Sequence, residues 1–310
     1  MSKTLAVFGA TGQQGSSVIH HVLNDASLSQ QYTIRGITRD TTSPASQKLA
    51  EKISLIQGDI SNPHSLRTAL TNVHTVFIMT IPDFSPNAVE IEYHSGKTIV
   101  DIAIEMGVQY IIFSTLPHVS ALSHGKYTHV TAFDTKAQIE QYIQSRAIKS
   151  SFISLGSFMQ NFQAQDFLAP RKAANGTWVM SRCASAKMPF PLLDAVADAG
   201  KFVGAILAEP DKYQGNTFCA AAKIYTMGEI VAALSKSSGK NVVYEQVSEE
   251  TFKSGLPFAA EMFAEYHSFC EEFGYWGPGS KEKVAWAVEN ARGKLATLEE
   301  FLKAHPYQLE

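Results

Sequence analysis

The first half of the chain alternates short apolar runs with longer amphipathic segments. Six runs are rich in β-branched and aromatic residues: TLAVF (4–8), YTIRGIT (32–38), ISLIQ (53–57), TVFIMT (75–80), YIIFST (110–115) and SSFISL (150–155). Their apolar residues are nearly continuous, which is typical of strands that are covered on both faces. Because the spacing leaves room for crossover helices, these runs predict a parallel sheet.

The amphipathic segments supply helices for those crossovers. SNPHSLRTAL (61–70) begins with capping residues and carries a proline where a first helical turn tolerates one. The segments 86–107 and 131–146 are also helical in pattern, and the first of them ends on a glycine. We therefore expect an α/β fold with a doubly wound parallel Rossmann sheet.

The regular alternation ends near residue 156, where Gly, Pro and Ser clusters divide the chain into shorter pieces. We predict a Rossmann domain over residues 1–155 and a smaller, mainly helical C-terminal lobe over residues 156–310. A helical pattern at 194–207 indicates that residues 189–210 return to the first domain. The junction between two lobes is a common place for a small-molecule site.

Composition and charge narrow the class of protein. The chain has 26 Lys and Arg against 29 Asp and Glu, a net charge of -3, so we expect no direct binding of nucleic acid. Its three cysteines lie in no CxxC pair and at no metal-ligand spacing from histidine, so we expect no metal site and a reducing compartment. Neither a signal-peptide pattern nor an apolar run of about 18 residues is present, which predicts a cytoplasmic protein without a membrane segment.

A glycine-rich turn follows the first apolar run. Gly9, Gly12 and Gly15 form GxxGxxG between that strand and a helical pattern. In a dinucleotide-binding turn, one glycine allows a sharp bend, another allows the backbone to approach a diphosphate, and the last allows the helix to pack on the strand. The helix then offers free N–H groups to the phosphates. The coenzyme-binding residues predicted here are Gly9, Thr11, Gly12, Gln13, Gln14 and Gly15.

The end of the second run, GITRD, bears on the choice of coenzyme. Arg39 could pair with the 2′-phosphate of NADP(H), which we expect to be the cofactor. In the alternative interpretation Asp40 accepts a ribose hydroxyl, as in NAD(H) binding, and Arg39 is a solvated charge. Asp59, in QGDI after the third run, is a candidate for the adenine side of the site, although a helix-capping role explains it as well.

The segments VFGATGQQGSSV, GITRD, IQGDI, FSTLPH, FDTKAQIEQYI and LGSFMQNF occur in order between residues 4 and 162. Through them the chain resembles the NmrA-like group of atypical short-chain dehydrogenases, which is related to the isoflavone-reductase-like enzymes and to the human NmrA-like NADPH sensor. The resemblance implies coenzyme contacts near the nicotinamide, which it assigns to Thr80, Ser114, Lys136, Phe158 and Asn161.

The usual proton donor of short-chain dehydrogenases is the tyrosine of YxxxK. Lys136 falls where the family has its lysine, but Ala132 stands four residues earlier in place of tyrosine. A literal YxxxK, Tyr93 to Lys97, lies on the preceding crossover helix, and we expect it to face away from the site.

Similarity to the isoflavone-reductase-like enzymes implies that Lys136 could act in catalysis without a tyrosine. A surface lysine on an amphipathic helix is the alternative. His124, Tyr127 and His129 are candidate donors or substrate contacts in the loop before Lys136, unless they belong to a solvated loop.

Two functions follow from these features. The first is an NADPH-dependent reductase of a small apolar or aromatic carbonyl, imine or activated alkene, using Lys136. The second is a non-catalytic NADP(H) redox sensor that acts on a regulatory protein partner, in the cytoplasm and, for this role, in the nucleus as well. The sequence leaves the oligomeric state and the substrate open.

Overall fold

The computed structural model describes residues 2–81 and 87–309, and its largest element is a seven-stranded parallel sheet. The strand order is β11-β6-β5-β4-β1-β2-β3. The strands are β1 (Lys3–Phe8), β2 (Tyr32–Thr38), β3 (Ser54–Gln57), β4 (Thr75–Ile78), β5 (Tyr110–Thr115), β6 (Lys149–Leu155) and β11 (Thr217–Ala220). The six predicted strands and the doubly wound α/β fold are therefore confirmed.

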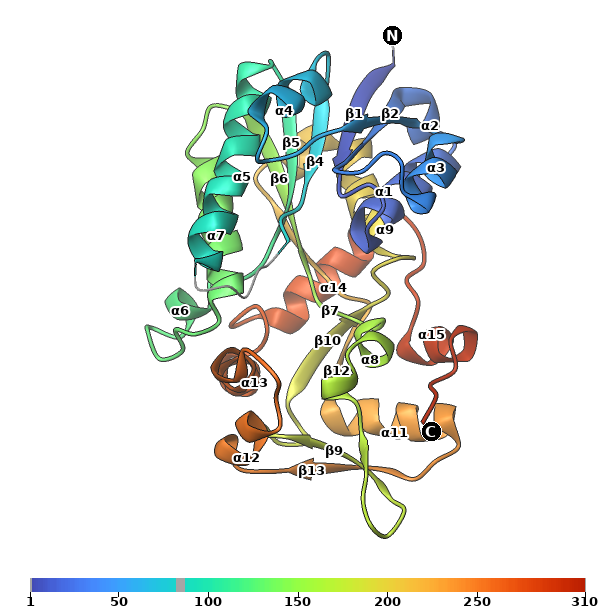
Figure 1. Ribbon diagram of the computed structural model, residues 1–310, viewed down its shortest axis with the longest axis vertical. Helices are drawn as coiled ribbons and strands as arrows, with labels where there is room; N and C mark the ends of the chain where they lie inside the picture. Colours follow the sequence, from blue (N-terminus) through green and yellow to red (C-terminus); the bar gives the residue numbers. More distant parts are fainter. Residues whose placement is uncertain (1, 82–86, 310) are drawn as a thin grey trace.

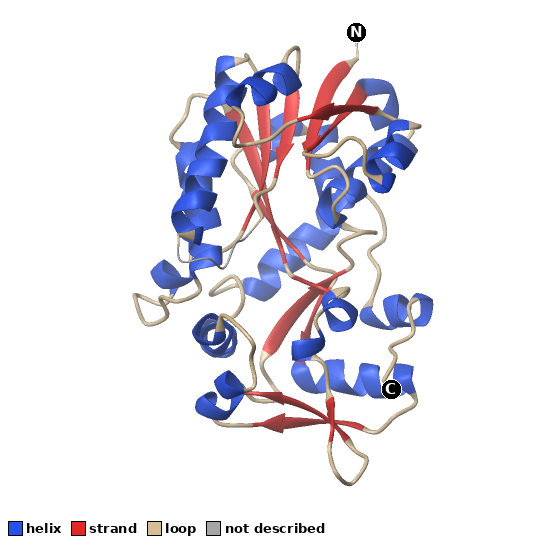
Figure 2. Cartoon of the chain, in the orientation of Figure 1, coloured by secondary structure: helices blue, strands red, loops and turns tan. Residues whose placement is uncertain are grey.

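Helices cover both faces of this sheet (Figures 1 and 2). One face carries α1 (Gln13–Asn24), α2 (Leu28–Gln31) and α9 (Ala199–Ala208), and the other carries α4 (Pro63–Leu70), α5 (Ala88–Glu105) and α7 (Thr131–Gln144). Strand β1 shows why its apolar run is continuous. Leu5 and Val7 pack into the core with α1 and α9, whereas Ala6 and Phe8 pack into the core with α4 and α5.

Local capping sets where two of these helices begin. The Asn62 side chain accepts a hydrogen bond from the Ser65 amide, and Pro63 occupies the first turn, so α4 starts two residues inside the predicted segment. Helix α9 starts five residues later than the pattern predicts, because the Asp194 carboxylate accepts hydrogen bonds from the amides of Val196 and Ala197 and holds a turn there.

The second lobe contains two small sheets as well as helices. One sheet joins β12 (Lys223–Thr226), β10 (Pro189–Leu193) and β7 (Ser157–Phe158), and the other joins β13 (Val242–Gln246), β9 (Trp178–Arg182) and β8 (Arg171–Lys172). Its helices are α8 (Asn161–Ala164), α11 (Met227–Ser238), α12 (Glu249–Ser254), α13 (Ala260–Phe273) and α15 (Leu298–Ala304), with a 3-10 turn at Asp166–Leu168. The remaining short helices are α3 (Pro44–Ala50), α6 (Val119–Leu122) and α10 (Pro210–Tyr213).

The path of the chain between the lobes differs from the expected boundaries. Within residues 189–210, β10 belongs to the second lobe, and the chain returns to the first lobe only at α9. Strand β11 and helix α14 (Ser280–Asn290) also lie in the first lobe, although the sequence pattern places residues 211–310 in the second. Phe218 of β11 packs on Trp286 of α14, with ring centroids 4.8 Å apart.

Helices α1 and α9 approach so closely that only glycine fits at their contact. A Cβ atom on Gly200 would lie 2.2 Å from the Ser17 carbonyl oxygen, and the Gly200 amide donates to Ser17 Oγ over 2.9 Å. Because the obstacle is backbone, the two helices would have to separate to admit a side chain.

Gly200→Ala is therefore expected to lower the free energy of unfolding by about 2–3 kcal/mol, through overpacking of this contact. Urea titration followed by circular dichroism measures the loss. Gly228→Ala is the matched control, because a Cβ there would meet its nearest neighbour at an ordinary 3.5 Å, and we expect it to be neutral or stabilising by up to about 1 kcal/mol. Equal stability of the two variants would contradict the close approach.

In the part of the chain that the structure describes, no helix combines the length and the apolar character needed to cross a bilayer.

Candidate functional site

The glycine turn after β1 is shaped by three different steric requirements. Gly9 has a φ of +63°, a left-handed conformation that favours glycine. The Gly12 amide donates to the Gly9 carbonyl over 2.8 Å, which closes the turn. A Cβ on Gly15 would lie 2.2 Å from the Gly9 carbonyl oxygen, so α1 can pack on the turn only with glycine at this position.

The start of α1 is prepared to receive an anion. Gly12 is the N-cap residue and contributes no side-chain hydrogen bond to the first turn, which leaves N–H groups facing outward. Gln14 follows in that turn, and its Oε1 atom is buried without a hydrogen-bond partner among the described residues. The phosphates of a dinucleotide can accept hydrogen bonds from the N–H groups at the start of α1, and its carboxamide can donate one to Gln14 Oε1. This part of the structure therefore fits a dinucleotide.

The end of β2 presents Arg39 to solvent. Its exposed side chain lies near Asp59, since the charge of Arg39 contributes to lowering the pKa of that carboxyl, after the larger effect of hydrogen bonds from Ser61. Asp59 Oδ1 accepts from both the amide and the hydroxyl of Ser61, which holds a turn before α4, whose N-cap residue is Asn62 rather than Asp59. Asp40 Oδ1 likewise accepts from the amide and hydroxyl of Thr42. Both carboxylates thus hold local turns, whereas the exposed Arg39 guanidinium forms no ion pair within 4 Å among the residues that the structure describes.

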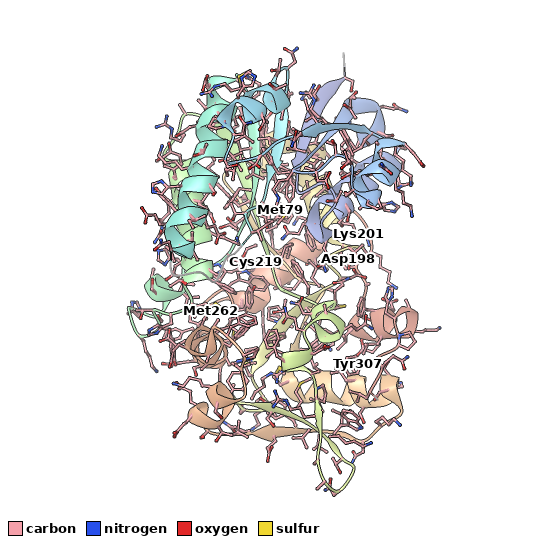
Figure 3. All side chains as sticks on the ribbon, viewed as in Figure 1. Met79, Asp198, Lys201, Cys219, Met262 and Tyr307 are labelled. Carbon is pink, nitrogen blue, oxygen red and sulfur yellow. The ribbon has the colours of Figure 1, made fainter. Side chains whose placement is uncertain are left out.

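A cavity of about 410 Å³ opens at the carboxyl ends of β4, β5 and β6, between the two lobes. Predicted coenzyme-site residues from five different segments meet on its wall. They are Gln14, Thr80, Ser114, Lys136, Phe158 and Asn161. Figure 3 labels one further wall residue from each lobe, Met79 after β4 and Met262 on α13. Ala132, at the position where short-chain dehydrogenases usually have the tyrosine of YxxxK, also lines the cavity.

Lys136 is buried at the edge of this cavity and is fully engaged by hydrogen bonds. Its Nζ donates to the Thr80 carbonyl over 3.1 Å, to Thr80 Oγ1 over 2.8 Å, and to the Glu92 carboxylate. The Thr80 hydroxyl in turn donates to Glu92 Oε1 over 2.6 Å. Because an ammonium has three N–H donors, a contact between Lys136 and a ligand requires one of these bonds to be exchanged.

The electrostatics of this pair are set by burial. Burial lowers the pKa of Lys136, and the charge of Glu92 opposes that change. Sequence reasoning missed Glu92, which is 44 residues from its partner. A signal was present in the helical pattern, because Glu92 shares the buried stripe of α5 with Gly96, Ile99 and Ala103. A carboxylate on such a stripe needs a buried cation.

The loop before α7 does not bring its candidate donors to the cavity. His124 is exposed and has a φ of +53°. The Tyr127 hydroxyl donates to Glu272 over 2.8 Å, and His129 Nδ1 lies 2.7 Å from Glu265 Oε1. Since both acceptors belong to α13, Tyr127 and His129 attach the loop to the second lobe, and none of the three candidates lies on the wall of the cavity.

The literal YxxxK pair also lies elsewhere, as expected. Lys97 bonds to Asp101 on the same helix and lies 4.9 Å from the centroid of the Tyr142 ring. Tyr93 packs into the core beneath α5. Neither residue lines the cavity.

Among the described residues, no group of three His, Cys, Asp or Glu side chains is arranged to hold a metal ion.

The second lobe contributes an aromatic wall that the sequence did not predict. Phe133 of α7 packs between Tyr266 and Tyr275, and the Tyr266 hydroxyl lies 3.0 Å from Ser157 Oγ. His267, beside Tyr266 on α13, is buried, and its Nδ1 donates to the Phe263 carbonyl over 2.7 Å. Burial, with a smaller effect of the Arg182 charge, lowers the pKa of His267 to about 3. His267 is therefore neutral in the folded protein near neutral pH.

This neutral histidine makes stability depend on pH. Below its unfolded pKa of about 6.5 the unfolded chain gains a proton that folded His267 cannot accept, so stability is lost as pH falls from about 6.5 toward 3. Between pH 7 and pH 5 the expected loss is about 2 kcal/mol for this residue. Urea unfolding at pH 7 and pH 5 measures the loss of free energy of unfolding between the two pH values. This loss should be smaller by that amount in His267→Gln than in the wild type. An identical loss in both proteins would mean that His267 is not the buried neutral group described here.

Comparison with known sequences places the chain among proteins of one family. A sequence model of the NmrA-like family matches residues 1–302. An NmrA-like family domain-containing protein of Dictyostelium discoideum is 28% identical over 322 residues, covering 100% of both chains. An NmrA-like family domain-containing oxidoreductase of Aspergillus campestris is 29% identical over 274 residues, covering 83% of this chain and 79% of the relative.

Solved structures share the architecture. NmrA, a negative transcriptional regulator crystallised in complex with NADP, aligns with a TM-score of 0.78 and 22% identity over 97% of this chain and 94% of its own. The triphenylmethane reductase of Citrobacter sp., complexed with NADP(H), aligns with a TM-score of 0.75 and 20% identity over 97% of this chain and 99% of its own. At these identities the similarity shows a common fold.

Proposed function

The chain belongs to the NmrA-like family, and on this basis we propose that it is an NADPH-dependent reductase of a small apolar or aromatic carbonyl, imine or activated alkene. One observation carries the proposal. The cavity that begins at Gln14, Thr80 and Lys136 continues into the second lobe, and its whole volume, including the end proposed for the nicotinamide, is about 410 Å³. Volumes in this range accommodate small organic ligands.

The coenzyme proposed is NADP(H), which two proteins of the same fold bind in their crystals. The turn at Gly9, Gly12 and Gly15 fits its diphosphate, and Arg39 its 2′-phosphate. NADPH supplies a hydride when it is bound. Thr80, Ser114, Phe158 and Asn161 border the nicotinamide in this proposal, and Gln14 Oε1 gains a donor it otherwise lacks.

Lys136 acts in this proposal as the polar group at the reacting end of the cavity. Lys136 gives up one of its hydrogen bonds to Thr80 or Glu92. In its place it forms a hydrogen bond to the nicotinamide ribose or to the substrate atom that receives the proton. Burial lowers its pKa, which makes the ammonium a better proton donor, while Glu92 keeps it oriented and charged. The aromatic wall formed by Phe133, Tyr266 and Tyr275 excludes water and holds an apolar substrate.

The test is an NADPH-oxidation screen against aromatic aldehydes, ketones, imines and enones, with mass spectrometry of the products. At least one acceptor is expected to be reduced by the wild type. Tight NADPH binding without reduction of any acceptor would contradict the reductase and favour a coenzyme sensor. Lys97→Met serves as the variant that should leave turnover unchanged, because Lys97 bonds to Asp101 outside the cavity.

Arg39→Ala is expected to weaken NADP⁺ binding about 10- to 100-fold, the range for loss of a charge-assisted bidentate pair, and to change NAD⁺ binding by less than about threefold. Calorimetric titration of both coenzymes measures the two effects. Lys48→Ala, on neighbouring α3, removes an exposed charge nearby and should leave both affinities unchanged. Equal losses for NADP⁺ and NAD⁺ would refute the assignment and favour Asp40 as the ribose acceptor.

A further inference from the structure

Arg182, at the end of β9, is a buried cation. Only 5% of its surface is exposed. Its guanidinium donates to the Ser181 carbonyl over 2.8 Å and to the Leu168 carbonyl over 2.6 Å. These bonds use two of its five N–H groups. No carboxylate forms an ion pair with it among the described residues, so its charge is balanced only by carbonyl dipoles.

Arg182 is also part of the wall of the cleft between the lobes. It shares that wall with Leu168 and His267, at the end formed by the second lobe. The other cation of this cavity, Lys136, belongs to the first lobe and is already neutralised by Glu92. Figure 1 shows α7, the helix that carries Lys136, and β9, the strand that ends at Arg182, in opposite lobes. His267 adds no positive charge, since it is neutral.

A buried, uncompensated charge is costly, and proteins keep one where a ligand supplies the opposite charge. The planar guanidinium fork suits a carboxylate, which it can bind through two parallel hydrogen bonds. The wall between the two ends is largely apolar, with Phe162, Phe190 and Met227 among its residues. An aromatic or aliphatic body can fill that space.

We infer that the substrate is an organic anion, whose carboxylate binds Arg182 while its apolar body lies across the cavity and its reducible group faces Lys136. This inference rests on the proposed function, because it specifies the substrate class of the same cleft. It also explains why Arg182 is buried without an acidic partner in the described part of the chain.

The test compares naphthoate with naphthamide, which have the same ring and nearly the same shape but differ in charge. Calorimetric titration with NADP⁺ present, and again without coenzyme, gives their affinities with no turnover. The wild type is expected to bind naphthoate at least about tenfold more tightly than naphthamide, as for a charge-assisted pair. Arg182→Gln should lose this preference and retain its affinity for naphthamide and NADPH.

Arg171→Gln is the matched control, because Arg171 is an exposed arginine of the same small sheet that lies outside this cavity and shares with Arg182 only a second hollow of about 200 Å³. It should keep the wild-type preference. Arg182→Lys keeps the charge and should keep much of the preference, which provides a second variant should the glutamine variant not fold. Equal binding of the two probes by the wild type, binding of neither, or an unchanged preference in Arg182→Gln would overturn the inference. Failure of NADPH to bind the wild type would instead refute the proposed function. The two failures can be told apart, because the probe titration without coenzyme does not depend on NADPH binding.

Discussion

Lys136→Met is expected to lower kcat/KM for an accepted substrate by about 10²- to 10⁴-fold, the usual contribution of a positioned proton donor. The same substitution leaves the Glu92 carboxylate buried, with only the Thr80 hydroxyl donating to it among the contacts described above. Removing one partner of a buried ion pair typically costs about 3–5 kcal/mol, so stability should fall by that amount. Steady-state kinetics and urea unfolding measure the two losses.

A double variant separates these effects. Lys136→Met/Glu92→Met removes both charges, and buried ion pairs are often replaced by apolar residues at little net cost. Its stability is therefore expected to return to within about 1 kcal/mol of the wild type, while activity remains lost. A stable double variant with wild-type turnover would show that Lys136 has only a structural role.

Gly15→Ala is expected to weaken NADPH binding by about 100-fold or more, because the added Cβ would stand 2.2 Å from the Gly9 carbonyl oxygen. The start of α1 would have to move away from the turn, and the N–H groups that face the diphosphate would move with it. Overpacking should also lower the free energy of unfolding by about 1–3 kcal/mol. Fluorescence titration of NADPH and urea unfolding measure these changes.

Gly228→Ala controls for the change of residue type, because it lies in α11 and meets no close neighbour. It should bind NADPH as the wild type does. A folded Gly15→Ala protein with wild-type affinity would mean that the turn is not the diphosphate site.

The sequence was most informative where a local pattern coincides with a structural requirement. Continuous apolar runs predict β1 to β6, and the central strands β1, β4 and β5 are covered on both faces, whereas the edge strand β3 is only partly buried. Gly9 and Gly15 are identifiable because their positions tolerate no side chain. Strand β11 escaped prediction, because it follows the part of the chain in which strands and helices alternate regularly, and its neighbour β6 is more than 60 residues away in sequence.

The cavity wall shows where sequence reasoning ends. Lys136 could be assigned from its resemblance to a family position, but its partner Glu92 comes from another helix. Arg182 and His267 are unremarkable in sequence, and they acquire their properties only from burial beside each other in the second lobe. For the same reason His129 looked like a candidate donor until the structure placed Glu265 beside it. Long-range contacts of this kind are set by tertiary packing, which one sequence does not specify.

The central claim is that the crevice between the glycine turn and Arg39 binds NADPH. Calorimetric titration of the wild-type protein with NADPH and NADH tests it directly. The account predicts one NADPH site per chain, with an affinity at least about tenfold higher than that for NADH, because a charge-assisted pair to the extra phosphate is lost in NADH. Absence of saturable NADPH binding, or equal affinity for the two coenzymes, would contradict it.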